Sequence, residues 1–195
     1  MDALEWTASA MRAARAQLDV ATQNLANVSS DGFRRQAAQV RLTPAGLVTT
    51  TRGIREQGAV RTTGRAFDLA MLGPGAFRVG DMTTRAGAFV RDRDGWLVDD
   101  RGRRLQGSRG PLRVSAEAKI DADGAVRDGG RIVDRITLPP GTHVLAGALE
   151  TSTVNAIGET LSILIAQRAF ETAQKTLLAI DATREKNAND VLRVQ

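Results

Sequence analysis

The two ends of the chain carry the pattern that most restricts its fold. Residues 2–28 contain neither Gly nor Pro, and within them Leu4, Met11, Leu18 and Leu25 recur every seven residues. The interleaved heptad position carries mostly small residues, namely Thr7, Ala14, Ala21 and Val28. A repeat of this kind predicts a long helix that packs lengthwise against another helix. Gly32, which can adopt the left-handed conformation, is expected to end it.

A second long helix is predicted from about Ser152 to Leu192, with Thr151, Ser152 or Thr153 as its cap. It contains a single glycine, Gly158. One apolar stripe is formed by Ile157, Leu161, Leu164 and Ile165, and a displaced one by Phe170, Ala173, Leu177 and Ile180. A shifting stripe indicates a helix that contacts more than one neighbour.

The middle of the chain differs in composition, because it holds most of the 19 glycines together with short apolar runs. Asp-Gly or Arg-Gly pairs at 94–95, 101–102, 123–124 and 128–129 separate several of these runs, as in β-hairpins. The predicted strands are 67–72, 76–79, 87–91, 96–98, 103–105, 112–114, 125–127 and 132–138. We therefore expect four segments: an N-terminal helix and turn (1–33), a connecting segment (34–48), a β-rich middle domain (49–149) and a C-terminal helix (150–195).

The expected lengths limit how these segments can pack. At 1.5 Å per residue the helices would be about 40 and 60 Å long, whereas a β domain of roughly 100 residues has a radius of gyration near 13 Å. Such a domain cannot cover both helices along their length. The predicted class is therefore α+β, with long N- and C-terminal helices that form a coiled coil and flank a compact all-β domain. The helix seams meet each other or those of neighbouring molecules.

Charge and composition argue against nucleic-acid binding, cysteine chemistry and membrane insertion. The net charge is +5, which raises nucleic acid as a partner. However, arginines are interleaved with acids, and the pairs at 34–35 and 103–104 are the only adjacent ones. We therefore expect no nucleic acid partner. The absence of Cys excludes thiolate catalysis and cysteine-ligated zinc. We also predict no cleaved signal peptide and no membrane insertion, since neither a basic n-region with an apolar stretch nor a run of about 18 apolar residues occurs.

No catalytic or cofactor motif stands out. Asp121, Asp123 and Asp128 suggest a calcium loop, but their spacing lacks the third early acid and the terminal Glu of an EF-hand, so a turn is the favoured interpretation. A single histidine, His143, leaves little for a triad or a histidine metal site. We predict no enzyme activity, no cofactor and no metal.

Several motifs in order resemble the flagellar rod and hook axial proteins. Residues 23–35 (QNLANVSSDGFRR) resemble the family's N-terminal signature. Residues 57–60 (QGAV), 63–79 (TGRAFDLAMLGPGAFRV), 84–89 (TRAGAF) and 94–98 (DGWLV) resemble its β domain. Residues 149–155 (LETSTVN) and 167–171 (QRAFE) resemble the entry into its last helix and the signature inside that helix. The resemblance is strongest to the proximal and distal rod proteins and leaves the position along the rod open.

This resemblance implies a fold, a location and partners. It implies terminal helices paired near the axis of a helical tube, and a self-assembling subunit of the basal-body rod that transmits torque from motor to hook. The implied partners are copies of the chain, other rod and hook axial proteins, and the flagellar type III apparatus, which would export it to the periplasmic side of the envelope. The residues expected to act in assembly are Leu4, Met11, Leu18, Asn24, Leu25, Asn27, Gly32, Phe33, Val154, Asn155, Ile157, Leu161, Leu164, Gln167, Arg168, Phe170, Leu177 and Ile180.

Two questions stay open at this point. Asn24 and Asn27 either hydrogen-bond across subunits or to exposed carbonyls, or simply terminate the helix. Gln167 and Arg168 either fix the register between packed helices or form an exposed edge of the stripe, and register is favoured. Three further functions compete with a rod subunit: a hook-like or non-motor axial paralogue, a basic nucleic-acid-binding protein, and an enzyme of unrecognised type.

Overall fold

The computed structural model describes residues 2–193, and side chains as far as residue 186. The chain divides into two compact units, and each is described by itself. The first unit joins the two ends of the chain to residues 35–54 and is called the helical unit. The second comprises residues 27–34 and 55–153 and is called the β unit.

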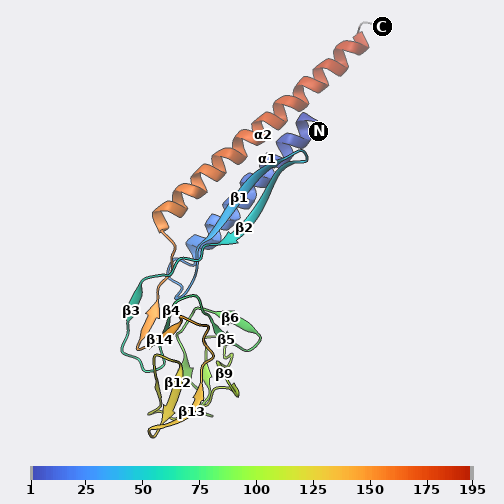
Figure 1. The fold of residues 1–195 in the computed structure, drawn as a ribbon. Helices are drawn as coiled ribbons and strands as arrows, with labels where there is room; N and C mark the ends of the chain where they lie inside the picture. The colour runs from blue at the N-terminus through green and yellow to red at the C-terminus, as the bar shows by residue number, and fades with distance from the viewer. Residues whose placement is uncertain (1, 194–195) are drawn as a thin grey trace. The chain divides into compact units, whose positions relative to one another are not determined.

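The helical unit contains two long helices, α1 (Ala3–Ala26) and α2 (Ala156–Arg193). Their 24 and 38 residues correspond to about 36 and 57 Å. The helices lie side by side and run antiparallel (Figure 1). The side chains of Asp2 and Arg184 pair at one end, and those of Asn24 and Glu159 at the other. The predicted pairing of the terminal helices is therefore confirmed.

A long β-hairpin lies along α1 in the same unit (Figure 1). It consists of β1 (Gln36–Thr43) and β2 (Gly46–Gly53), which pair antiparallel from Gln36↔Gly53 to Thr43↔Gly46. The amide N–H of Leu47 donates to Ser9 Oγ of α1 at 3.2 Å, which attaches the hairpin to the helix. The local sequence predicts no strand here, and the expected domain boundary at residue 49 falls inside β2.

The β unit is built from many short antiparallel strands. The paired strands of two residues or more are β3 (Val60–Thr62) with β15 (Ala148–Glu150), β4 (Leu69–Leu72) with β14 (His143–Ala146), β5 (Phe77–Val79) with β6 (Met82–Thr84), β7 (Val90–Arg91) with β8 (Leu97–Val98), β9 (Gln106–Gly107) with β10 (Gly110–Pro111), and β11 (Lys119–Ile120) with β12 (Ala125–Asp128) and β13 (Arg131–Arg135). Paired helices and a middle of small antiparallel sheets confirm the predicted fold class.

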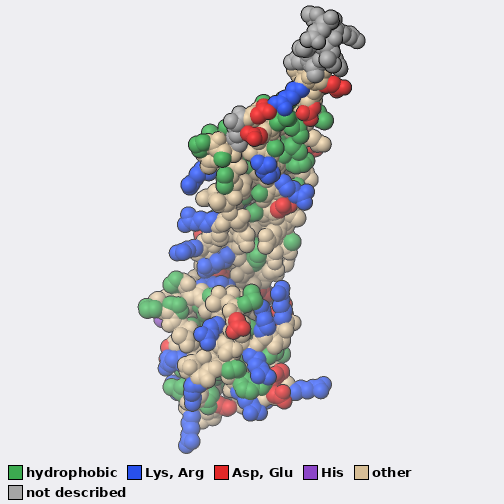
Figure 2. All heavy atoms as spheres, turned by 90° about the vertical axis from the view of Figure 1, so that its right-hand side faces the viewer, with side chains coloured by type: hydrophobic (Ala, Val, Ile, Leu, Met, Phe, Trp, Pro, Cys, Tyr) green, Lys and Arg blue, Asp and Glu red, His purple; other side chains and the backbone are tan. Residues whose placement is uncertain are grey.

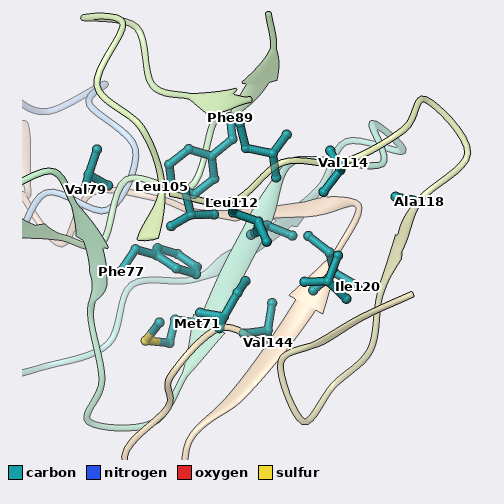
Figure 3. Close-up of a cluster of buried hydrophobic side chains, with 14 residues drawn as sticks. Met71, Phe77, Val79, Phe89, Leu105, Leu112, Val114, Ala118, Ile120 and Val144 are labelled. Carbon is teal, nitrogen blue, oxygen red and sulfur yellow. The ribbon is translucent and has the colours of Figure 1, made fainter. Parts of the chain in front are cut away.

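The core of the β unit is a single cluster of apolar side chains (Figure 3). Phe77 and Phe89 meet edge to face, with ring centroids 5.4 Å apart and planes at 89°, a favoured geometry for aromatic pairs. Met71 of β4 and Val144 of β14 lie close together below them in Figure 3. Strands far apart in the sequence thus contribute to one core.

Three local predictions are wrong. Residues 103–105 and 112–114 were predicted as strands but form only isolated β-bridges, such as Trp96↔Arg113 and Val98↔Arg104. In the β unit, strands also lie where none was predicted, namely β3, β6, β9, β10, β11, β14 and β15. Finally, α2 begins at Ala156, because Asn155 and not residue 151, 152 or 153 caps it: Asn155 Oδ1 accepts from Gly158 N at 3.1 Å.

Candidate functional site

The pair of helices contains most of the residues expected to act in assembly, and α1 buries its small side chains. The buried residues of α1 are Thr7, Ser9, Ala13, Ala14, Ala21 and Asn24. The large heptad residues, Leu4, Met11, Leu18 and Leu25, are only half-buried. Small side chains let two helix backbones approach closely. The small residues of α1 therefore make its closest contacts within the chain, whereas the large residues keep part of their surface exposed.

The face of α2 that packs on α1 also follows a heptad. Glu159, Ala166 and Ala173 are buried and spaced seven residues apart. Phe170, Leu177 and Ile180 are half-buried on the same side. The second stripe seen in the sequence is therefore the one that α1 covers.

The first stripe of α2 lies on the far side of that helix. At 100° per residue, Ile157, Leu161 and Leu164 project nearly opposite to Ala166. Their exposed fractions are 76%, 55% and 50%, and that of Ile165 is 68%. A soluble helix normally has one apolar face. This part of α2 has two, and only one is covered within the chain. We call the second one, formed by Ile157, Leu161 and Leu164, the outward stripe. Ile165 lies at its edge, since it lines a pocket with Val20 and Ala21 of α1.

Two surface grooves run along the helix pair. One, of about 610 Å³, is lined by Trp6, Thr7, Ala10, Arg168, Ala169, Thr172, Ala173 and Thr176. The other, of about 490 Å³, is lined by Ala8, Met11, Arg12, Arg15, Ala16, Asp19 and Phe170. Gln167 and Arg168 are both exposed, so neither is buried between helices within one chain. Their proposed role in register requires a neighbouring molecule.

Asn24 joins three elements of the helical unit. Its side chain pairs with the backbone of Gln36 in both directions, since Nδ2 donates to the carbonyl at 2.7 Å and Oδ1 accepts from the amide at 2.9 Å. Nδ2 also donates to Glu159 Oε2 at 3.1 Å. Arg35 Nε donates to the other carboxylate oxygen, Oε1, at 2.5 Å. Asn24 therefore links α1 to the hairpin and to α2, a role that neither sequence interpretation described.

Asn27 and Gly32 belong to the turn that follows α1, in the β unit. The Ser30 hydroxyl donates to Asn27 Oδ1 at 3.1 Å, and Ser30 N donates to the Asn27 carbonyl. Gly32 has the expected positive φ of 68°. Its amide donates to the Glu150 carbonyl at 2.7 Å, and the Phe33 carbonyl accepts from Thr153 N at 3.0 Å. This turn is thereby paired with the residues that precede α2.

A buried ion pair supports the turn. Arg85 and Glu150 are 6% and 1% exposed, with Nη2 and Oε2 2.7 Å apart. Arg85 also donates to the carbonyls of Met71, Gly73 and Gly75 at 2.6–2.7 Å, and Glu150 Oε1 accepts from Gly58 N at 2.9 Å. Burial and the nearby Arg85 lower the pKa of Arg34, while Glu150 raises it. In the sequence, Arg85 and Glu150 are recognisable only as parts of separate motifs and not as a pair.

The three aspartates that suggested a calcium loop have partners within the β unit. Asp121 pairs with Arg127, Asp123 with Arg135, and Asp128 accepts from Ser115. Among the described residues there is no group of three or more potential metal ligands. His143 lies exposed on β14. None of the described helices combines the length and hydrophobicity that a membrane crossing requires.

Comparison with known proteins agrees with this arrangement. Residues 4–34 match the family described as "Flagella basal body rod protein", and residues 145–191 match "Flagellar basal body rod FlgEFG protein C-terminal". The matched segments contain α1 with its turn and most of α2.

Individual relatives cover the chain more fully. The flagellar basal-body rod protein FlgG of Bacillus subtilis (strain 168) is 27% identical over 255 residues, covering 93% of this chain and 96% of the relative. The rod protein FlgF of Caulobacter vibrioides is 27% identical over 229 residues, covering 92% of each. The flagellar hook protein FlgE of Brucella abortus is 38% identical, but the match covers 51% of this chain and 29% of the hook protein.

Paired terminal helices around a β-rich middle, with these motifs in order, define a flagellar axial protein of the structural, non-enzymatic kind. The chain belongs to the flagellar basal-body rod FlgEFG family and is a structural protein of the rod similar to FlgF and FlgG.

Proposed function

We propose that the chain polymerises through its terminal helices into the helical shaft of the rod, and that the outward stripe of α2 is the contact with a neighbouring subunit. The observation that supports this most directly is the second apolar face of α2. All of its residues are at least half exposed although they alternate with the covered face along the same helix turns. Because apolar burial is worth about 1.5–3 kcal/mol for a Leu or Ile side chain, leaving this face in water is unfavourable unless another chain covers it.

The proposed partners, which the family suggests, are copies of this chain and other rod or hook axial proteins. The contact would be heterologous, since the outward stripe of one subunit meets a different surface of the next, and such contacts generate open helical assemblies. The same proposal includes export through the flagellar type III apparatus, a location in the rod on the periplasmic side, and transmission of torque to the hook.

The test compares Leu161→Asp/Leu164→Asp with a matched control, Gln174→Asp, which adds a charge at an exposed polar position of α2. Both variants are expressed in a strain that lacks the gene, and purified hook–basal bodies are quantified by mass spectrometry. We expect the parent and the control to be incorporated. Since each 1.4 kcal/mol corresponds to tenfold in affinity, the double variant should be depleted at least about tenfold.

Two further outcomes separate the alternatives. If the unmodified chain is absent from intact basal bodies and motility survives deletion of the gene, the chain is a paralogue outside the motor and the proposal fails. Arg168→Glu tests the register role separately: normal incorporation of that variant would refute it without affecting the role of the outward stripe.

A further inference from the structure

An exposed cluster on the β unit combines an indole ring with two guanidinium groups. The Cζ atoms of Arg104 and Arg113 lie 4.7 and 5.7 Å from the centroid of the Trp96 ring. Cations at these distances are attracted to the ring face. Both arginines are exposed and Trp96 is half-buried. We call these three residues the Trp96 cluster.

The backbone beneath the cluster is fixed by the hydrophobic core. Trp96 and Arg104 immediately precede the fully buried Leu97 and Leu105, and Arg113 lies between the buried Leu112 and Val114. Trp96 and Arg113 face each other in an isolated bridge. Because neighbouring strand residues point to opposite sides, each core residue directs its neighbour outward. The three side chains are thus presented from a rigid base.

The two guanidinium groups have unused binding capacity. Arg113 Nε donates to the Asp94 carbonyl at 2.8 Å, which leaves its terminal nitrogens without a carboxylate. Within the described part of the chain, neither Arg104 nor Arg113 forms an ion pair, although Arg103 next to them pairs with Asp99. An arginine fork recognises a carboxylate with two parallel hydrogen bonds. Stacking on the indole reduces the entropy that would be lost on binding.

We propose that the Trp96 cluster binds an acidic segment of a partner protein. An acidic segment is the expected occupant, because two guanidinium groups beside one ring place two positive charges close together. Exposed Val90, which pairs with Val98 beside the cluster and is 60% exposed, adds an apolar contact typical of protein interfaces.

A nucleic acid fits the cluster less well. The guanidinium groups cover the indole, so the ring is not free to stack on a base. Acidic side chains also lie nearby, among them Asp92, Asp94 and Asp99. In the lower part of Figure 2, which is the β unit, acidic side chains lie among the basic ones. Nucleic-acid binding requires several phosphates to be neutralised along the backbone, and these acids interrupt the basic surface.

Fluorescence titration tests this proposal on the full chain. The sequence has two tryptophans, so Trp6→Phe leaves Trp96 as the reporter. The probes are a synthetic peptide of alternating glutamate and valine, the same peptide with glutamine in place of glutamate, and a thymidine oligonucleotide. We expect a saturable change in Trp96 emission with the glutamate peptide, weaker at high salt, and little change with the glutamine peptide.

Matched variants assign the binding to the cluster. Arg104→Glu/Arg113→Glu should weaken binding of the glutamate peptide at least about tenfold, while Arg101→Glu, an exposed arginine of the same unit with no contact to the ring, should not. If the charge-reversal variant fails to fold, Arg104→Lys/Arg113→Lys can replace it. That variant retains the charge but loses the paired N–H donors of the guanidinium, and it should still bind the peptide more weakly than the parent. Unchanged binding by these variants, or tighter binding of the oligonucleotide than of the peptide, would overturn the proposal. The outcome does not depend on the polymerisation test, since the cluster lies outside the terminal helices.

Discussion

Replacing Gly32 by alanine should destabilise the β unit strongly, because the turn after α1 leaves no room for a methyl group. A Cβ atom at residue 32 would lie 2.3 Å from the carbonyl carbon of Arg85 and 2.5 Å from the amide nitrogen of Ala86. Both are backbone atoms and cannot rotate away. The φ angle of +68° adds strain for any residue with a side chain.

The size of the effect follows from these two terms. The left-handed conformation costs alanine about 1–2 kcal/mol, and forcing a methyl group into a packed site costs about 1–3 kcal/mol. Reduced entropy of the unfolded chain returns about 0.4–1 kcal/mol. The free energy of unfolding should therefore fall by about 1–4.5 kcal/mol. Gly64 is the matched control, since its φ is +75° and nothing lies within 4 Å of an added Cβ. Gly64→Ala should cost only about 0–1.5 kcal/mol.

Urea unfolding followed through Trp96 emission, in a Trp6→Phe background, reports on the β unit. The difference between the two alanine variants isolates the contact with Arg85 and Ala86 from the backbone strain they share. Equal destabilisation of the two variants would show that the turn does not pack on that backbone, and the reasoning would be refuted.

Two further perturbations concern ionised groups. Glu159→Ala removes the buried partner of Asn24 and Arg35. Because the Arg35 side chain is 38% exposed and can reach water, we expect the free energy of unfolding to fall by about 1–3 kcal/mol and not by the full cost of a buried charge. In thermal unfolding followed by circular dichroism, the control Glu171→Ala, on the exposed part of α2, should change stability by less than about 0.5 kcal/mol. For Asp99, burial raises the pKa, but hydrogen bonds from the Arg103 side chain and from the backbone N–H groups of Arg103 and Arg101 lower it below its usual value overall. A carboxyl whose folded pKa is depressed stabilises the fold above its unfolded pKa of about 3.9 and loses that contribution as the pH falls through the folded value. Asp99→Asn should therefore reduce the loss of stability below about pH 4, and a pH dependence identical to that of the parent would contradict this.

The elements that follow from local pattern were predictable. A heptad without Gly or Pro predicts a helix whatever lies elsewhere in the chain, and both terminal helices are present. Asp-Gly pairs between short apolar runs indicated a β domain with many turns, and Gly32 has the left-handed conformation that its position suggested.

The hairpin β1–β2 could not be recognised in this way. Many of its side chains are polar, and no residue of β1 is fully buried. Without a clear alternation of apolar and polar residues, the strand signal is weak. The hairpin forms because α1 lies beneath it, and that contact is not visible in the local sequence.

The sequence by itself determined that two helices flank a β-rich middle and that the last helix is apolar on more than one side. The tertiary structure decided which of those sides is covered, since Ala166 and Ala173 face α1 while Ile157, Leu161 and Leu164 do not. It also decided the pairing of Arg85 with Glu150, 65 residues apart, and of Asn24 with Glu159, 135 residues apart. The physical reason is that helix and turn formation depend on interactions within a few residues, whereas the partner of a buried polar group is chosen by whatever the folded chain brings within hydrogen-bonding distance.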